Sequence, residues 1–293
     1  MIEKPLRFME GLFCGNIFLT LHSLKTIIKY FSILTIIGLI FISCDGFEKL
    51  VKSSDYELKL KKAQEYYGKG NYIKALQLYE ELILIFKGSE KAEEIYYYIA
   101  YCNYYQNDFS LSQYHFKNYC RQFPSGGHVE ECYFLNAYCY YLSSPNYKLD
   151  QSDTKAAIKE FQSFIDEYPD SKRIDTCNLL IDNLRYKLEN KDYDLTKQYF
   201  KLSDYKAAIA SSKSFMKEFP GSKFVEELYY LIIDSYYLLA INSISTKKME
   251  RLNGAIENYL KFVDLYPQSS FKGKAESVYT SCVEVKDNII KKK

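Results

Sequence analysis

The sequence predicts an all-α chain built from repeated helix hairpins, and three observations predict it. Glycine (12) and proline (6) are scarce among 293 residues, which argues against an all-β chain with many tight turns. Hydrophobic residues make up 47% and charged residues 26%, the composition of an ordered globular protein. One pattern of small and aromatic residues also recurs five times after Asp55. The net charge of +2 provides no basic field, so we expect no nucleic-acid partner.

The first segment of the chain has the pattern of a secretory leader. The apolar run Tyr30–Ser43 is as long as a signal-peptide core and shorter than the ~20 residues that a bilayer-spanning helix needs. Lys25 and Lys29 precede the run, as the positive region of a signal peptide should. The alternative is an uncleaved membrane anchor. In either case we expect most of the chain to leave the cytoplasm.

The end of this run resembles a bacterial lipobox, because the small residue Ser43 stands directly before Cys44. The resemblance implies cleavage between Ser43 and Cys44 and acylation of Cys44, so that residues 1–43 are a lipoprotein signal peptide. Residues 44–54 are then expected to be a lipidated tether. Acyl chains contribute ~0.8 kcal/mol per buried methylene, enough to hold the chain on a membrane without basic residues.

The repeated pattern begins with a helix and a short turn. A small residue then follows, with an apolar or aromatic residue seven positions later and, except in the fourth copy, an aromatic residue four positions later. The last four copies close with Tyr-Pro or Phe-Pro. Small residues allow two helix backbones to approach closely, and proline cannot continue a helix. Serines after three of the prolines are suited to helix starts. The small residues of the five second helices are Ala75, Ser112, Ala157, Ala208 and Ala255.

This pattern resembles the tetratricopeptide repeat. The resemblance implies an all-α solenoid of about five helix hairpins plus a C-terminal helix, over residues 55–293. The third to fifth copies are longer than the regular period of ~34 residues, which predicts insertions. The clearest insertion is 143–151, expected as a loop between the two helices of the third copy.

Tyrosine (31) and phenylalanine (19) are more abundant than a core of this size requires, so we expect some rings to line a working surface. In tetratricopeptide arrays, the first helix of each hairpin lines a concave groove. Counting from the small residues of these helices predicts an aromatic groove suited to an extended or aromatic peptide. The alternative is that several rings pack against the next repeat. The predicted groove residues are Tyr67, Tyr97, Tyr101, Tyr104, Phe134, Tyr138 and Tyr141.

No catalytic or cofactor motif was found: GxGxxG, P-loop, HExxH and GxSxG patterns are all missing from the sequence. We therefore expect no enzyme, no cofactor and no metal site. Adjacent carboxylates such as Glu80-Glu81 are expected to be solvated. Six cysteines follow Cys44, and none of them forms a CxxC motif. Their apolar helical contexts favour buried free thiols, and a disulfide between some of them is the alternative.

Several phrases are similar to the BamD family of outer-membrane lipoproteins. They are Ser144–Gln151, Leu184–Glu189, Tyr199-Phe200, Leu239–Ser243 and Glu250-Arg251. The resemblance implies a lipid-anchored scaffold on the periplasmic face of the outer membrane that assists β-barrel assembly. It also implies that N-terminal repeats (55–169) receive C-terminal segments of unfolded barrel proteins. C-terminal repeats (170–293) would dock onto a BamA-like barrel-forming subunit. The alternative is another periplasmic repeat lipoprotein that organises envelope or cell-wall complexes.

Overall fold

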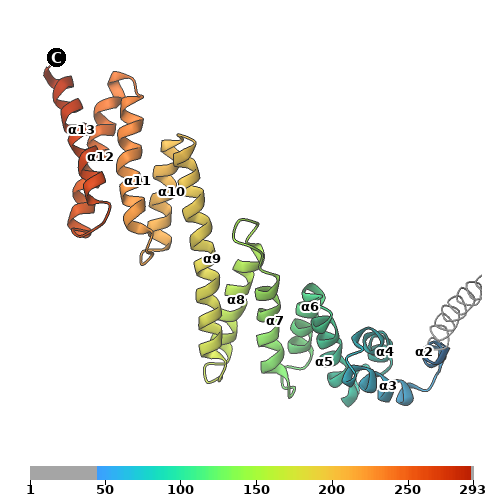
Figure 1. Cartoon of the computed structure of the whole chain (residues 1–293). Coiled ribbons are helices and arrows are strands. Elements are labelled where there is room, and N and C mark those ends of the chain that lie inside the picture. Colours follow the sequence, from blue (N-terminus) through green and yellow to red (C-terminus); the bar gives the residue numbers. More distant parts are fainter. Residues whose placement is uncertain (1–44, 292–293) are drawn as a thin grey trace, which may run out of the picture. The chain divides into compact units, whose positions relative to one another are not determined.

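The computed structural model describes residues 45–291, so the predicted signal peptide and the Ser43/Cys44 lipidation site lie outside the described residues. All the regular structure within 45–291 is helical (Figure 1). The elements are α2 (Asp45–Lys52), α3 (Tyr56–Gly68), α4 (Tyr72–Ile85), α5 (Glu90–Tyr105), α6 (Phe109–Gln122), α7 (Val129–Ser143), α8 (Ser152–Glu167), α9 (Ile174–Lys201), α10 (Tyr205–Glu218), α11 (Val225–Ile241), α12 (Ser245–Leu265) and α13 (Lys272–Lys291). The chain forms two compact units, Met1–Cys102 and Asn103–Lys293, with the boundary inside α5.

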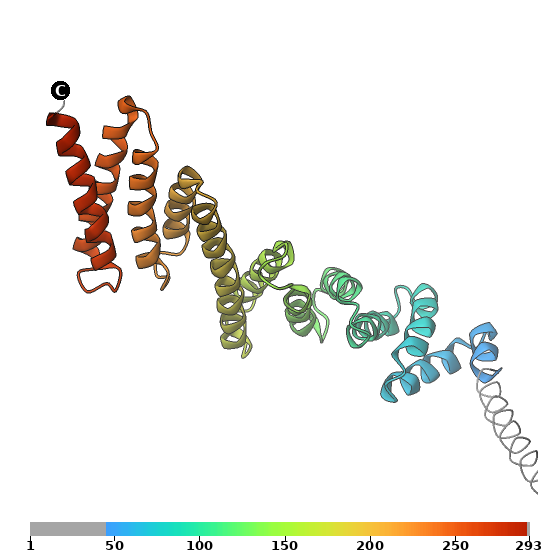
Figure 2. The ribbon, with the colours of Figure 1, turned by 45° about the horizontal axis from the view of Figure 1, so that its top comes forward.

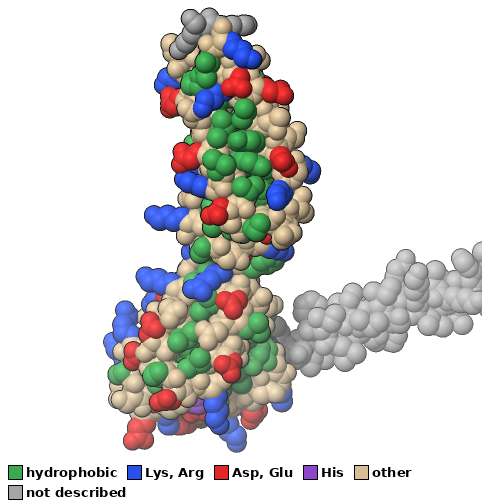
Figure 3. Space-filling view, turned by 90° about the vertical axis from the view of Figure 1, so that its left-hand side faces the viewer, with side chains coloured by type: hydrophobic (Ala, Val, Ile, Leu, Met, Phe, Trp, Pro, Cys, Tyr) green, Lys and Arg blue, Asp and Glu red, His purple; other side chains and the backbone are tan. Residues whose placement is uncertain are grey.

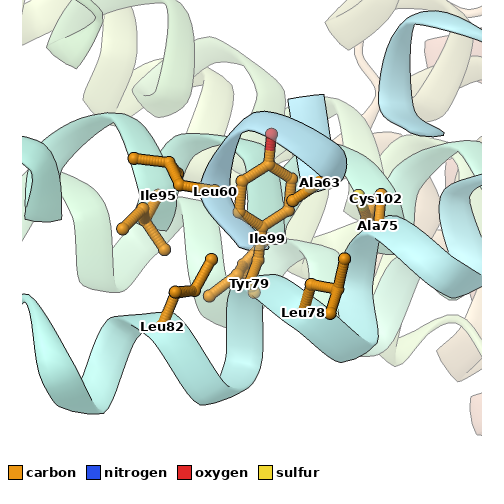
Figure 4. Packing of buried hydrophobic residues seen from close by; sticks show 9 residues of the cluster. All are labelled: Leu60, Ala63, Ala75, Leu78, Tyr79, Leu82, Ile95, Ile99 and Cys102. Carbon is orange, nitrogen blue, oxygen red and sulfur yellow. The ribbon is translucent and has the colours of Figure 1, made fainter. Parts of the chain in front are cut away.

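The first unit is held together by one apolar cluster between α3, α4 and α5 (Figure 4). Helix α3 begins where Asp55 accepts the backbone N–H of Leu58, and α4 begins where Asn71 accepts that of Lys74. Gly70 links the two helices with a φ of 73°, a conformation that favours glycine. These local signals set the α3–α4 hairpin, and the cluster then fixes α5 against it.

The small residues of the repeated pattern occupy the helix crossings, as predicted. Each of them is fully buried, so a larger side chain at these positions would push the paired helices apart. They are Ala63, Ala75, Ala100, Ser112, Ala137, Ala157, Ala208 and Ala255. This burial and the order of the hairpins confirm the all-α tetratricopeptide-type fold.

The stretch expected to be a tether contains a helix, α2. Phe47, Leu50 and Val51 lie on one side of this helix and pack against the apolar cluster of the first unit. The ring of Phe47 also meets the ring of Tyr66 edge-on, with the centroids 5.5 Å apart. The chain directly after residue 44 is therefore fixed to the first repeat.

The second unit continues as antiparallel hairpins in which successive helices lie side by side (Figures 1 and 2). Helix α9 has 28 residues, twice the length of α10, and contacts both α8 and α10. It therefore belongs to two hairpins, which explains part of the long spacing between the third and fourth copies. The last helix, α13, packs against α11 and α12.

The closing Tyr-Pro and Phe-Pro pairs end the second helices as predicted, but the serines that follow act differently from the expected caps. Ser171, Ser222 and Ser269 each accept the backbone N–H of the residue two positions later. The helices begin after those residues, so the serines stabilise the turn that leads into each helix.

The 143–151 insertion lies between α7 and α8, as predicted, and it is highly ordered. The Gln151 side chain is only 4% exposed and donates to the carbonyl groups of Asn146, Leu149 and Asp150. Lys187 of α9 donates to the hydroxyl group of Ser144 at 2.6 Å. The Gln151 hydrogen bonds therefore hold the loop together, and the Lys187 hydrogen bond joins the loop to α9.

The six cysteines of the described residues are free thiols. Five are buried, and Cys120 is partly exposed. Burial raises the pKa of Cys102 to about 12 and that of Cys139 to about 11, so these thiols stay protonated and unreactive at neutral pH. The burial of five of these thiols within the helical repeats agrees with the sequence analysis, which favoured buried free thiols over disulfides.

Among the described helices, none combines the length and the apolar character that crossing a bilayer requires.

Candidate peptide-binding surface

Three of the predicted groove residues lie in the first unit, within a network of phenol rings. Tyr67 of α3 lies 4.6 Å from the ring of Tyr98 and 5.5 Å from that of Tyr72, measured between centroids. Tyr97 and Tyr101 of α5 form a second contact, with centroids 4.7 Å apart. Tyr97 also meets Tyr98 at 5.6 Å. The three predicted residues therefore belong to one continuous aromatic network, and all three are half-buried.

The other predicted groove residues lie in the second unit, where α7 carries a stacked ladder of three rings. Tyr138 stacks on Phe134 at 5.8 Å and on Tyr141 at 5.6 Å, with planes within 14° and 13° of parallel. These residues are spaced four and three positions apart, so they share one face of the helix. Tyr138 and Tyr141 are half-buried. We call these three rings the α7 ladder.

Phe134 was predicted to line the groove, but its side chain is buried. Its side chain is only 7% exposed and contacts the rings of Phe161 and Phe164 at 5.9 and 5.8 Å. The guanidinium group of Arg173 lies 4.8 Å from the ring centroid and covers it. Phe134 is therefore the buried base of the α7 ladder, and Tyr138 and Tyr141 are its accessible part.

Tyr104, the remaining predicted residue, is half-buried near the start of the second unit. Its ring meets those of Tyr105 and Phe109 edge-on, at 5.5 and 6.0 Å. Burial raises the pKa of Tyr104, and proximity to Tyr138 adds to the effect. The phenol therefore stays neutral and able to donate a hydrogen bond at neutral pH.

Sequence reasoning missed Tyr98, which joins the rings of the first unit. It stacks on the fully buried Tyr79 at 5.4 Å with planes 14° apart, and it also contacts Tyr67 and Tyr97. Burial raises the pKa of Tyr98, and Glu94 raises it further. The Tyr96-Tyr97-Tyr98 run was a visible signal, but counting from the small residue selected only the middle ring.

The C-terminal hairpins also carry accessible apolar side chains. The half of the second unit that ends at the C-terminus has a band of apolar side chains between charged ones (Figure 3). Leu260 and Leu265 of α12 and Ile290 of α13 are each more than half exposed. An apolar band of this kind is a common feature of protein interaction surfaces.

In the part of the chain that the structure describes, no group of His, Cys, Asp and Glu side chains could hold a metal ion.

The sequence of the repeat region matches a known protein family. The family model described as YfiO, outer membrane lipoprotein, matches residues 54–209 and 185–287, nearly all of the repeat region. The chain belongs to this family. The matched ranges include the rings of the aromatic network, the α7 ladder, Leu260 and Leu265, and they end before Ile290.

Three curated relatives carry the name outer membrane protein assembly factor BamD. The protein of Caulobacter vibrioides is 20% identical over 191 residues, and the alignment spans 65% of this chain and 61% of that protein. The Pasteurella multocida protein is 18% identical, with 75% and 88% covered, and the Rickettsia prowazekii protein is 24% identical, with 42% and 49% covered. The chain thus spans less than two thirds of the Caulobacter relative.

Similar solved structures are tetratricopeptide proteins. The TPR2AB-domain:pHSP90-complex of yeast Sti1 is 15% identical with a TM-score of 0.39, covering 80% of this chain and 90% of that one. The P58(IPK) TPR domain is 12% identical with a TM-score of 0.39, covering 84% and 68%.

Proposed function

We propose that this chain is an assembly factor for β-barrel proteins of the outer membrane, acting as a lipid-anchored scaffold and substrate receptor without enzymatic activity. The observation that carries this proposal is the YfiO match across residues 54–287. The curated relatives named outer membrane protein assembly factor support the same role.

The receptor part of the proposal rests on the accessible rings of the repeats within 55–169. Tyr138 and Tyr141 present stacked phenols, and Tyr97 and Tyr101 present a second pair. Phenol rings provide a large, stiff contact area with little entropy to lose and a polar tip for hydrogen bonds. Each of these two ring pairs therefore suits the C-terminal segment of an unfolded barrel protein, held in extended conformation.

The docking part of the proposal rests on the repeats within 170–293. Leu260, Leu265 and Ile290 are exposed there, and the last helix, α13, ends the described hairpins. We propose that this surface docks onto a BamA-like barrel-forming subunit. The separation of a docking end from a receptor end would let one chain bring a substrate to the insertion machinery.

The anchoring part of the proposal rests on Cys44 and the helix that follows it. Helix α2 packs on the first repeat through Phe47, Leu50 and Val51. An acylated Cys44 would therefore attach the first repeat to the outer membrane with almost no intervening linker. Replacement of Cys44 by Ala should release the chain from membranes, whereas continued sedimentation with membranes would identify an uncleaved anchor.

Co-purification tests the proposed role. The full chain, tagged at its C-terminus and solubilised gently from native membranes, should recover a BamA-like barrel-forming protein. Recovery of envelope or cell-wall enzymes without such a protein would support the alternative of a periplasmic lipoprotein organiser and overturn the assembly role.

A peptide-binding experiment tests the receptor surface separately. Tyr138→Ala and Tyr141→Ala should each weaken binding of a C-terminal barrel peptide. Tyr114→Ala is the matched control, because Tyr114 is 59% exposed on α6, does not belong to the α7 ladder, and its ring meets that of His115 with the centroids 5.2 Å apart. Equal binding by all three variants would remove the α7 ladder from the proposal.

A further inference from the structure

A hollow of about 510 Å³ lies between α2 and α3, within the first unit. Its α2 side is lined by Gly46, Lys49 and Leu50, and its α3 side begins at Leu58 and ends at Lys69. The lining residues of each helix recur mostly at steps of three or four positions, so each helix offers one face. The volume is within the range of small-ligand sites.

Positive charge dominates the lining of this hollow. Three lysines, Lys49, Lys62 and Lys69, line it together with a single carboxylate, that of Glu65. Glu65 is compensated, because Lys62 Nζ donates to Glu65 Oε2 at 2.8 Å. The lining therefore carries an excess of positive charge, which an anion would offset.

The hollow also offers apolar surface and a hydroxyl group. Leu50, Leu58 and the ring of Tyr66 line it, and Leu58 is 41% exposed. The Ser53 hydroxyl accepts the backbone N–H of Asp55 at 3.0 Å, so its own proton is available to an acceptor in the hollow. The lining thus suits an anion that is joined to a hydrocarbon group.

The position of the hollow along the chain indicates where such an anion comes from. Gly46 is two residues after Cys44, and two residues of extended chain reach at most about 7 Å. Acylation of Cys44 would therefore hold the hollow at the level of the lipid headgroups. A phospholipid joins a phosphate to hydrocarbon chains, so it has both parts that the lining favours, and clustered lysines beside a membrane attract anionic lipids.

We propose that the hollow between α2 and α3 binds the headgroup of an anionic phospholipid, with Lys62 and Lys69 contacting the phosphate and Leu50 and Leu58 contacting the first methylenes of the acyl chains. This inference rests on the acylation of Cys44 proposed above. The lipid contact fixes how the first repeat faces the membrane, whereas acyl chains on one residue alone would leave it free to rotate.

Native mass spectrometry of the full chain, purified from membranes in a non-ionic detergent, measures the binding of added lipid. Phosphatidylglycerol should bind saturably, with one molecule per chain. Phosphatidylcholine with the same acyl chains has no net charge, and sn-glycerol 3-phosphate has no hydrocarbon chain, so each should bind about tenfold more weakly. Binding of sn-glycerol 3-phosphate as tight as that of phosphatidylglycerol would identify a site for free phosphate compounds and overturn the lipid assignment.

Matched lysine variants locate the binding. Lys62→Gln and Lys69→Gln should each weaken the binding of phosphatidylglycerol about fivefold, as expected for one lysine beside an anionic headgroup. The Lys62–Glu65 pair is exposed, so its loss should leave the fold intact. Lys61→Gln is the control, because Lys61 is an exposed neighbour on α3 that does not line the hollow, and it should leave binding unchanged. An equal loss in all three variants, or no loss in Lys62→Gln and Lys69→Gln, would overturn the proposal.

The mass of the purified chain keeps this test separate from that of the anchor, because acyl groups on Cys44 add to it. If the chain is acylated and phosphatidylglycerol does not bind, the hollow is rejected and the anchor stands. If the chain lacks acyl groups and still binds phosphatidylglycerol through Lys62 and Lys69, the hollow stands and the anchor is rejected. Displacement of the bound lipid by a C-terminal barrel peptide would assign the hollow to a peptide and overturn the proposal.

Discussion

Lys59 Nζ lies 2.6 Å from Glu81 Oε1, and the lysine side chain is only 1% exposed. The same ammonium group donates to the backbone carbonyl of Val51, near the end of α2, at 2.6 Å. One buried charge thus joins three helices of the first unit: α2, α3 and α4. Because α2 begins directly after Cys44, the proposed lipidation site, the ion pair would hold the first repeat close to the proposed anchor.

Breaking this pair should destabilise the first unit. Glu81→Gln leaves the buried ammonium group without its counter-charge and should lower the free energy of unfolding by roughly 2–4 kcal/mol. Chemical denaturation monitored by far-UV circular dichroism measures the loss, and hydrogen exchange should show faster exchange in α2. The double variant Lys59→Met/Glu81→Leu should recover most of the stability.

The control for that prediction is Lys91→Met. Its partner Glu57 is 2.5 Å away, but both side chains are exposed, so the loss should stay below about 1 kcal/mol. If Glu81→Gln lowers the free energy of unfolding as little as Lys91→Met does, the Lys59–Glu81 ion pair does not hold α2 in place.

The two ends of the α7 ladder should respond differently to truncation. Phe134→Ala empties a buried site between α7 and α8 and should cost roughly 3–5 kcal/mol. Tyr141→Ala removes a half-buried ring and should cost about 1 kcal/mol or less while weakening peptide binding. Thermal unfolding and peptide titration of both variants check this division. A large stability loss in Tyr141→Ala would mean that the ring serves packing and not recognition.

Asp234 should make the second unit less stable as the pH rises. Burial raises the pKa of this carboxyl, although the Tyr230 hydroxyl donates to it at 3.4 Å and opposes the rise. The groups that face Asp234 are Tyr230 and the Cys282 thiol of α13. Since the folded state holds the proton more tightly than the unfolded chain, this stabilising contribution is present below about pH 4 and is lost as the pH rises through the folded pKa.

Asp234→Asn therefore should raise the melting temperature at pH 7.5, and the gain should shrink as the pH approaches 4. Scanning calorimetry at both pH values measures the two gains. An equal gain at both pH values would mean that the charge of Asp234 is not the cause.

Gly254 of α12 lies against the ring of Tyr236, so a side chain at position 254 would crowd that ring. A Cβ atom at this position would lie 2.8 Å from Tyr236 Cε1 of α11. Alanine gains about 1 kcal/mol of helix propensity, but the clash with a packed ring costs roughly 1–3 kcal/mol. Gly254→Ala should therefore be neutral to destabilising by up to about 2 kcal/mol. Adding Tyr236→Leu should convert the same glycine substitution into a stabilising one, which thermal denaturation of the four variants would detect.

Much of the fold follows from local rules that a sequence displays. Ala75 and Ala157 had to be small because two helix backbones cross there, and that requirement acts over a few residues. The closing Tyr-Pro and Phe-Pro pairs and the position of the 143–151 loop between two helices are similarly local. These features were predicted correctly, together with the number of hairpins.

The features that sequence reasoning missed depend on contacts between distant segments. Helix α2 has eight residues, too few to be stable alone, and it exists because Phe47 and Leu50 reach the cluster of α3 and α4. Phe134 has the correct spacing for a groove, but Arg173, the residue directly before α9, covers it.

The most direct test of the account is photo-crosslinking in cells from position 141. A photoreactive phenylalanine analogue at Tyr141 should crosslink to C-terminal segments of unassembled barrel proteins, and the same analogue at the exposed Tyr114 on α6 should not. Crosslinks from position 114 as strong as those from 141, or crosslinks from 141 only to proteins other than barrel precursors, would contradict the receptor role.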